Sequence, residues 1–209
     1  MPSAIVFDFN GTLSDDEPVM CEIFQTLFAE HGKPLTEREY YDELAGLSDP
    51  EIVRTWLGAD HPDVDAVIQE RVDRYRAAVG DGSTIHAHMR QAVQVAAAQV
   101  PLAICSGAAR AEIEPVVGAA GLAGCFRAIV SSDDVVHGKP DPEGYLAAIE
   151  ALGTRDALVF EDTEAGIASA KAAGLHVIAK VGTLEPERLR QADELVERID
   201  ADLIRRCLS

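Results

Sequence analysis

The stretch AIVFDFNGTL, residues 4–13, decides the fold that we predict for this chain. Its apolar run, residues 4–7, is too short for a helix and is typical of a buried strand. The run ends abruptly at Asp8, and a polar segment with Gly11 follows. A carboxylate at the end of a buried strand indicates a site, and a second carboxylate two residues later would be its acid/base partner. The chain has Asn10 there, so the group that moves a proton is not evident.

Four more short apolar runs follow in the rest of the chain. A segment with apolar residues at helical spacing separates each of these runs from the next. Continuous apolar strands that alternate with helices predict a parallel sheet with helices on both faces. Right-handed crossovers then give a doubly wound α/β fold. The five predicted strands are residues 4–7, 101–105, 128–130, 157–160 and 176–179.

One region contains no strand-like run, and we predict that it is an all-helical domain inserted after the first strand. It covers residues 15–81, so that residues 1–14 and 82–209 form the α/β core domain. Apolar side chains recur at helical spacing in two of its segments. These side chains are Met20, Ile23, Phe24 and Leu27 in the first segment and Val64, Val67, Ile68 and Val72 in the second.

Other local patterns mark helix ends and the last elements of the chain. Thr36, with Glu39 three residues later, forms a capping-box pattern that begins a helix. From Leu184 to Ser209 we expect a closing helix, a short apolar patch at residues 195–196, and a last helix.

Composition and charge exclude several classes of protein. The 209 residues are 47% hydrophobic and carry a formal net charge of −18, so the surface repels nucleic acid and acidic membranes. No apolar run is long enough to span a bilayer, and no signal peptide is visible because Asp8 interrupts the first run. The four cysteines lack the spacing of a zinc site or a disulfide framework. We therefore expect a cytoplasmic monomer or homodimer that binds neither nucleic acid nor membranes.

Polar residues follow the predicted strands at the edge where doubly wound sheets bind ligands. The carboxylates of Asp8, Glu161 and Asp162 are hard oxygen ligands suited to Mg²⁺. A carboxylate screened from a phosphate by this metal can attack it and form an aspartyl phosphate. Ser106 can donate a hydrogen bond to a phosphoryl oxygen, and Lys139 supplies positive charge. Singly, each residue also fits a turn, a helix cap or a loop; together they indicate one site for Mg²⁺ and a phosphate.

Four segments, in this order, resemble the motifs of the haloacid dehalogenase superfamily of phosphotransferases. They are DFNGTL (residues 8–13), ICSGA (104–108), GKPDPEGY (138–145) and FEDTEAGIASAKAAG (160–174). The predicted helical insert resembles the cap domain of the subgroup that contains β-phosphoglucomutase and phosphoglycolate phosphatase. The resemblance covers nearly the whole chain. It implies a Mg²⁺-dependent phosphatase whose cap closes over a small phosphorylated metabolite and excludes water.

The resemblance also implies a role for each matching residue. Asp8 is the expected nucleophile and a Mg²⁺ ligand, and the backbone carbonyl of Asn10 is a second ligand. Asp162 is expected to bind the metal directly and Glu161 through a water molecule, while Thr12 supports the loop of Asp8. The implied phosphate-binding residues are Phe9, Asn10, Ser106, Gly107 and Lys139. The implied catalytic residues are Asp8, Asn10, Ser106 and Lys139.

Asn10 departs from the family pattern, in which an aspartate protonates the leaving oxygen and then deprotonates water. An amide has no accessible pKa for either step, and such groups contribute about 10²–10⁴-fold, so we expect a slow phosphatase. The change disfavours a sugar phosphomutase, and Asp49 stands where a basic residue would hold a second phosphate. We expect Asp15–Glu17 to form a hinge and a helix start rather than to replace the missing acid.

Two other functions stay open at this stage: a phosphonate or halide hydrolase of the same superfamily, and a catalytically weak phosphate-binding protein. Lys33 is the only lysine of the insert and does not match the Schiff-base motif of phosphonate hydrolases. The retained pair Glu161 and Asp162 disfavours dehalogenation, which needs no Mg²⁺. Asn10 also precedes Gly11, a pair prone to deamidation that would restore an aspartate.

Overall fold

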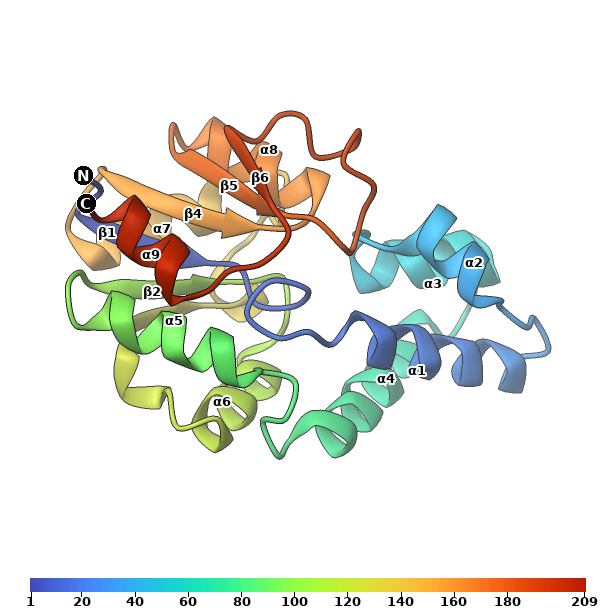
Figure 1. Ribbon diagram of the computed structural model, residues 1–209. Helices are drawn as coiled ribbons and strands as arrows, with labels where there is room; N and C mark the ends of the chain where they lie inside the picture. Colours follow the sequence, from blue (N-terminus) through green and yellow to red (C-terminus); the bar gives the residue numbers. More distant parts are fainter.

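The computed structural model describes all 209 residues and contains one six-stranded parallel sheet with the order β3-β2-β1-β4-β5-β6 (Figure 1). The strands are β1 (Ala4–Phe7), β2 (Leu102–Cys105), β3 (Phe126–Val130), β4 (Ala157–Glu161), β5 (His176–Lys180) and β6 (Glu194–Val196). The central strand β1 pairs with β2 and β4, and all four of its residues are buried. The α/β class and the five strands are therefore confirmed, and the apolar patch at residues 195–196 belongs to a sixth strand.

Strand register fixes where the polar residues lie. Phe7 of β1 pairs with Phe160 of β4, and their rings stack with centroids 5.2 Å apart. The N–H of Asp8 continues the ladder by donating to the Phe160 carbonyl at 2.9 Å. Asp8 and Glu161, each one residue further along, therefore come together at the carboxyl edge of the sheet.

Helices cover both faces of the sheet, as right-handed crossovers require. α5 (Ala87–Ala97) packs against α9 (Ala201–Cys207). α7 (Glu143–Leu152) packs against β2, β3 and α8 (Glu164–Ala172), and α6 (Arg110–Ala119) connects β2 to β3. The chain runs outward from β1 through β2 to β3, then returns to β4 on the other side. The edge between β1 and β4 is thus the switch point where doubly wound sheets bind ligands.

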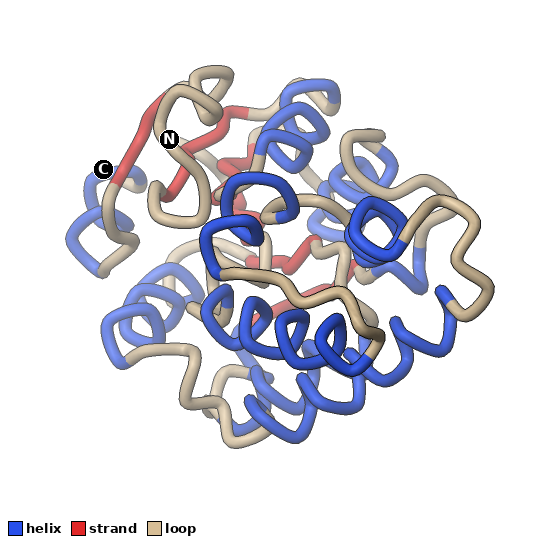
Figure 2. Tube along the Cα trace, turned by 90° about the vertical axis from the view of Figure 1, so that its right-hand side faces the viewer, coloured by secondary structure: helices blue, strands red, loops and turns tan.

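Between β1 and α5 the chain forms a helical insert, residues 17–79. Its elements are α1 (Glu17–Glu30), α2 (Glu37–Glu39), a π-helix (Tyr40–Leu44), α3 (Asp49–Leu57) and α4 (Val64–Val79). Thr36 caps α2 in the expected capping box with Glu39. α4 packs against α1 and α3, and it also contacts α6. Figure 1 shows the insert beyond the carboxyl ends of the strands, and Figure 2, seen from that side, shows its helices in front of them.

One continuous cluster of buried apolar side chains extends from the sheet into the insert. Phe7 and Phe160 belong to it, and so do Phe24 and Leu27 of α1. The insert is therefore packed on the core rather than tethered to it. None of the helices combines the length and the apolar composition that crossing a bilayer requires.

Two details of the expected helices are wrong. The segment from Leu184 to Asp193 consists of turns, not a helix. Its buried apolar side chains, Leu184 and Leu189, are five residues apart, a spacing that does not place them on one helical face. In α4 the buried residues are Val64, Val67, Arg71, Tyr75 and Val79, whereas Ile68 and Val72 are only partly buried. The helix is thus turned so that a charged residue joins its buried stripe.

Candidate active site

Three carboxylates meet at the carboxyl edge of the sheet. Asp8 follows β1, Glu161 ends β4 and Asp162 comes next, and one oxygen from each lies within 4.8 Å of the others. Asp8 is 6% exposed, and the other two residues are fully buried. Three carboxylates at this distance repel one another unless protons or cations compensate their charge. The cluster expected from the sequence is therefore present, and it requires positive charge.

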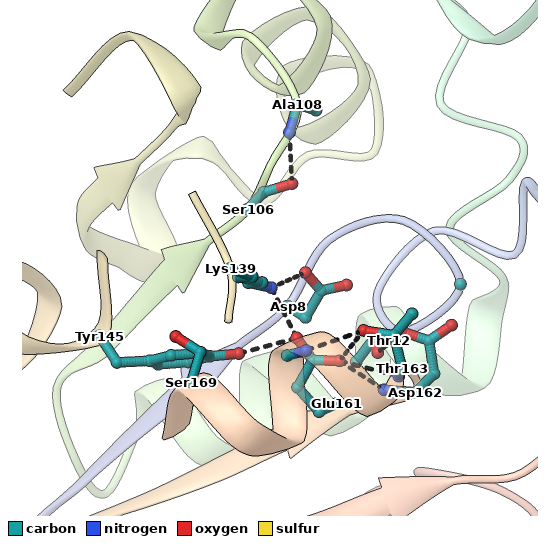
Figure 3. Close-up of polar contacts among 12 residues, drawn as sticks. Asp8, Thr12, Ser106, Ala108, Lys139, Tyr145, Glu161, Asp162, Thr163 and Ser169 are labelled. Carbon is teal, nitrogen blue, oxygen red and sulfur yellow. Dashed lines mark hydrogen bonds and ion pairs between the residues drawn. The ribbon is translucent and has the colours of Figure 1, made fainter. Parts of the chain in front are cut away.

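Lys139 supplies part of this charge. It lies in the loop between β3 and α7, and its Nζ is 2.5 Å from Asp8 Oδ1 and 2.5 Å from Glu161 Oε1 (Figure 3). The same ammonium lies 5.2 Å from the centre of the Tyr145 ring, within cation–π distance. Burial would lower the pKa of Lys139, but the charges of Asp8 and Glu161 outweigh it and raise that pKa. The ammonium therefore stays charged.

One ammonium does not neutralise the whole cluster. Burial raises the pKa of Asp8 to about 7, against the opposing charge of Lys139. Burial and the charges of Asp8 and Glu161 raise the pKa of Asp162 well above its ordinary value. Burial would also raise the pKa of Glu161, but the Lys139 ion pair and several hydrogen bonds leave that pKa lowered. A further cation beside Asp8 and Asp162 would relieve the repulsion, and such oxygen donors are the ligands that Mg²⁺ prefers.

Hydrogen bonds distinguish the two acidic residues at the end of β4. Glu161 Oε1 accepts from Lys139 and from the Tyr145 hydroxyl. Its Oε2 accepts from the N–H of Asp162 and from both the N–H and the hydroxyl of Thr163. Asp162 accepts from only two hydroxyls, those of Thr12 at 3.0 Å and Thr183. Asp162 therefore keeps lone pairs for a metal, whereas the oxygens of Glu161 are occupied by protein donors. This difference supports a direct metal contact for Asp162 and a contact through water for Glu161.

Two glycines let the backbone approach these carboxylates. Gly11 has a φ of +71°, and a Cβ built there would lie 1.9 Å from Asp162 Oδ2. A Cβ on Gly166, in the first turn of α8, would lie 1.7 Å from Glu161 Oε1. A side chain at either position would displace the acid, so both glycines are required by the site.

The expected phosphate-binding residues surround the same edge, with one exception. Ser106 follows β2, and its Oγ accepts from the Ala108 N–H at 3.1 Å, which leaves the hydroxyl proton free to donate. A Cβ on Gly107 would meet no neighbour, and both residues line the cavity that Asp8 faces. The side chain of Phe9 is fully buried and does not line this cavity. Only the backbone of Phe9 is left to contact a phosphoryl group.

Asn10 lines the cavity, but the nitrogen of its amide is engaged by groups outside it. Its Nδ2 donates to Asp16 Oδ2 at 3.0 Å and to the Tyr75 hydroxyl oxygen at 3.2 Å, and neither partner lines the cavity. Asp16 also accepts from the Gly11 N–H at 3.1 Å and from the Tyr75 hydroxyl. Deamidation requires the Gly11 nitrogen to attack the side-chain carbonyl carbon of Asn10. The hydrogen bonds to Asp16 hold the Gly11 N–H and the Asn10 amide in place, which disfavours this attack. Asn10 thus ties its loop to the helical insert.

A cavity of about 720 Å³ lies between the sheet edge and the insert, a volume typical of small-molecule sites. We call its two sides the core wall and the insert wall. The core wall includes Asp8, Ser106, Gly107, Lys139 and Asp162, and the insert wall includes Glu17, Met20, Tyr40, Ile68 and Arg71.

Arg71 joins the insert to the core. Its side chain, 6% exposed, pairs with Asp49 at the start of α3 and with Glu112 of α6, and its Nε has no partner. Asp49, which stands where a base would hold a second phosphate, is therefore neutralised by an arginine that sequence reasoning missed. The sequence does contain an indication that Arg71 is buried. It lies in α4 one turn after Val67 and one turn before Tyr75, on the buried face of the helix.

Comparison with known proteins assigns the family. A family model described as haloacid dehalogenase-like hydrolase matches residues 5–180. The chain belongs to the haloacid dehalogenase-like hydrolases. The matched region runs from β1 to the end of β5 and contains all four motifs and the helical insert. The family expected from the sequence is therefore confirmed, and the protein is a hydrolase.

Individual haloacid dehalogenase-like relatives sharpen this assignment. Validoxylamine A 7'-phosphate phosphatase of Streptomyces hygroscopicus subsp. limoneus is 32% identical over 94% of this chain and 94% of that protein. A phosphorylated carbohydrates phosphatase of Thermotoga maritima is 29% identical over 84% of this chain and 83% of that protein. A mutant of CbbY from Rhodobacter sphaeroides, in complex with xylulose-(1,5)bisphosphate, has a TM-score of 0.84 at 26% identity, over 97% of this chain and 96% of that chain. Two of these three relatives are named as phosphatases.

Proposed function

We propose that this hydrolase is a Mg²⁺-dependent phosphatase that transfers the phosphoryl group of a small phosphorylated metabolite first to Asp8 and then to water. The position of Asp8 carries the proposal. Lys139 holds its Oδ1, no other side chain donates to it, and Asp8 lines the cavity. A carboxylate between a fixed ammonium and an open cavity is suited to attack a phosphorus atom. Ser106 lines the same cavity and offers a donor to a phosphoryl oxygen.

The acidic cluster supports Mg²⁺ as the cofactor. Asp8 and Asp162 offer oxygens that are not saturated with hydrogen bonds, and the backbone carbonyl of Asn10 accepts none. These three groups are the proposed ligands, with Glu161 acting through water. When bound, Mg²⁺ would screen the Asp8 carboxylate from the phosphate and stabilise charge on the phosphoryl group.

The chain's own residues supply the remaining interactions. Lys139 and Ser106 would bind phosphoryl oxygens, together with the backbone of Phe9 and Gly107. The Thr12 hydroxyl, 3.0 Å from Asp162 Oδ1, keeps that carboxylate oriented. None of these groups has to move a proton, so the acid/base role stays separate from phosphate binding.

We also propose that the insert, within residues 15–81, is a cap over a core domain of residues 1–14 and 82–209. Its two connections leave the core side by side, since the hydroxyls of Ser14 and Thr84 lie 2.7 Å apart. The Asp15 N–H donates to the Thr84 carbonyl at 2.9 Å. Paired connections of this kind form a hinge, and closure about it would exclude water from the cavity.

The charges of the cavity favour a monophosphate with a neutral remainder. Four basic side chains line the cavity. Lys139 is held by the acidic cluster, and Arg71 is neutralised by two carboxylates. Arg54 and His137 are exposed. No buried cation is left for a second phosphate. Polar groups and apolar side chains such as Met20 and Ile68 suit a hydroxylated, sugar-like remainder. The relative named for phosphorylated carbohydrates supports this substrate class.

The setting that we propose for the enzyme is the cytoplasm, as a monomer or homodimer without a nucleic-acid or membrane partner. All four cysteines are unpaired, as a reducing compartment favours. The net charge of −18 works against binding to nucleic acid or acidic lipid.

Phosphonate and halide hydrolysis are less well supported than phosphatase activity. Lys33 donates to the Trp56 carbonyl and does not line the cavity, so the insert offers no lysine for a Schiff base. The pair Glu161 and Asp162 forms a buried acidic cluster, which dehalogenation does not require.

A panel of phosphate esters, assayed with and without Mg²⁺, tests the proposal. We expect the wild type to release phosphate only with Mg²⁺, and Asp8→Asn to lose about 10⁴-fold or more in kcat/KM. Asp15→Asn, an exposed carboxylate of the same segment, is the matched control and should stay close to wild type. Activity that survives in Asp8→Asn would reject the mechanism. Mg²⁺-dependent phosphate binding without hydrolysis of any ester would identify a binding protein instead.

A further inference from the structure

Glu17 lies on the insert wall of the cavity, opposite Asp8, and the roles described so far do not use it. It is the first residue of α1 and is partly buried. The Tyr40 hydroxyl donates to its Oε1 at 2.8 Å. Its Oε2 has no hydrogen-bond partner and is not sealed from solvent. Glu17 thus lines the cavity with one oxygen held by Tyr40 and the other without a protein partner.

The other lining carboxylates outside the acidic cluster are either paired with Arg71 or, in the case of Glu51 and Asp141, exposed. Asp49 and Glu112 are both paired with Arg71. Glu51 accepts from the N–H and hydroxyl of Ser48, and Asp141 accepts from the Glu143 N–H at 3.0 Å. Among these lining carboxylates, Glu17 is the one held only by a neutral hydroxyl.

The neighbours of Glu17 in the chain are excluded by their contacts. Asp16 is fully buried, does not line the cavity, and accepts from Asn10, Gly11 and Tyr75. Asp15 is exposed, lies outside the cavity lining, and contacts His86. The amide of Asn10 cannot exchange a proton and points at Asp16. None of these three residues is therefore placed to give a proton to the leaving oxygen.

The environment of Glu17 suits a group that changes its protonation state during turnover. Burial raises the pKa of Glu17 to about 7, the Tyr40 hydrogen bond and the charge of Lys180 oppose the rise, and the charge of Asp16 adds to it. Repulsion from Glu17 also contributes to the raised pKa of Asp162, although Glu17 lies outside the cluster of three carboxylates. The titratable groups that face Glu17 are Asp16, Cys21, Tyr40, Tyr41, Asp162 and Lys180.

We propose that Glu17 is the catalytic acid and base of this enzyme, in place of the aspartate that the family carries at position 10. The proposal rests on the phosphatase function above. As Asp8 attacks phosphorus, the P–O bond to the leaving group breaks and the leaving oxygen takes the proton of the Glu17 carboxyl. The resulting Glu17 carboxylate then takes a proton from water. The water oxygen attacks phosphorus, the bond from phosphorus to Asp8 breaks, and inorganic phosphate leaves with Glu17 protonated again.

Tyr40 is a positioning residue in this scheme, because it holds Oε1 and leaves Oε2 to the substrate. Tyr40→Phe removes a hydrogen bond that lowers the pKa of Glu17. We therefore expect the pH profile of Tyr40→Phe to shift to higher pH with the acid/base function retained. A merely structural role of Tyr40 would lower kcat without moving the profile.

The test compares wild type, Glu17→Gln and the control Glu22→Gln, an exposed residue of the same helix. The substrates are p-nitrophenyl phosphate, whose leaving group needs no proton, and the alkyl ester that the wild type hydrolyses fastest in the panel. With the alkyl ester, Glu17→Gln should lose about 10²–10⁴-fold in kcat, with KM little changed. With p-nitrophenyl phosphate it should release one equivalent of p-nitrophenol in a burst and then stall, because the water step lacks its base. Glu22→Gln should match the wild type with both esters.

The other outcomes each overturn a defined part of the scheme. Glu17→Gln turnover within about threefold of wild type with both esters would rule out the acid/base role. An equal loss with both esters, without a burst and with a raised KM, would make Glu17 a substrate-binding residue only. A wild type that hydrolyses p-nitrophenyl phosphate but no alkyl ester has no working acid, and would also overturn the role. A wild type inactive on every ester would reject the phosphatase itself.

Discussion

The two walls of the cavity are built differently. On the core wall, charges are fixed by dense contacts: five hydrogen bonds converge on Glu161, and Lys139 bridges it to Asp8. On the insert wall, groups have fewer partners: Glu17 has only Tyr40, and Arg71 has Asp49 and Glu112. The core wall therefore provides the reacting Asp8 and the fixed charges around it, and the insert wall provides groups that meet the variable part of the substrate. Removing one group at a time tests this division.

The largest effect should come from the core wall, through the unequal roles of its two neighbouring acids. Asp162→Asn removes a proposed direct ligand, so we expect the Mg²⁺ concentration for half-maximal activity to rise by more than about 10²-fold. Glu161→Gln keeps the shape of the side chain, and Glu161 is proposed to contact the metal only through water. We therefore expect the Mg²⁺ concentration for half-maximal activity to rise by about 10–100-fold in this variant. Mg²⁺ titrations of both variants, after removal of metal with EDTA, measure the difference.

Thermal stability without metal is the control for the variants Asp162→Asn and Glu161→Gln. Without metal, Asp162→Asn should be at least as stable as wild type in thermal unfolding, because it removes a charge whose pKa burial and repulsion raise. An equal Mg²⁺ requirement in both variants would show that the hydrogen bonds do not separate the two acids.

The next effect concerns the ion pairs that join the walls. Arg71→Met leaves Asp49 and Glu112 without their buried cation, and we expect a loss of about 3–5 kcal/mol in the free energy of unfolding. Arg74→Met on the same helix breaks only partly exposed pairs with Glu30 and Glu70, and should cost less than about 1 kcal/mol. Urea denaturation measures both variants. Equal losses would show that Arg71 does not anchor the insert.

Asn10 lies where the two walls meet, and Asn10→Asp sharpens the comparison further. An aspartate in this conformation would place a second carboxylate 3.0 Å from Asp16, so we expect a loss of about 1–3 kcal/mol at pH 8. Repulsion raises the pKa of such a pair in the folded state, so the loss should shrink as the pH falls and one proton is shared. Unfolding at several pH values checks this trend.

The activity of Asn10→Asp separates two accounts of the missing aspartate. If Glu17 already supplies the proton, kcat for the alkyl ester should change by less than about tenfold. A rise of about 10²-fold or more would mean that the asparagine limits the wild-type enzyme. The double variant Asn10→Asp with Glu17→Gln should regain part of the activity that Glu17→Gln loses.

The smallest expected effect is the stability of Glu17→Gln. Burial raises the pKa of Glu17 from the ordinary 4.5 to about 7, so the folded state binds its proton more tightly than the unfolded state. The stabilising contribution of that proton is present below pH 4.5 and is lost as the pH rises through 7. Glu17→Gln should therefore match the wild type at low pH and exceed it by about 1–3 kcal/mol at pH 8. A difference independent of pH would contradict the raised pKa.

The sequence predicted the core wall better than the insert wall, and the reason is physical. Asp8 and Ser106 directly follow apolar strands, and Glu161 ends one. Parallel strands end at one edge, so local patterns imply that these residues are close. Strand register then fixes Asp8 beside Glu161 without information from distant residues.

The insert wall depends on helix rotation and on contacts between distant segments, which local patterns do not contain. Glu17 reads as an ordinary acidic first turn until the fold brings Tyr40 to it. Arg71 lies among apolar residues of α4, and its partner Glu112 is far away in the sequence. For the same reason the partners of Asn10, Asp16 and Tyr75, became visible only in the folded chain.

The most direct test of the whole account is whether Asp8 carries the phosphoryl group during turnover. Wild-type enzyme with Mg²⁺ and p-nitrophenyl phosphate is quenched in acid, and its peptides are mapped by mass. We predict one phosphoryl group on Asp8, a larger phosphorylated fraction in Glu17→Gln because the water step is slow, and none in Asp8→Asn. A phosphoryl group on another residue, or continued turnover by Asp8→Asn, would contradict the account.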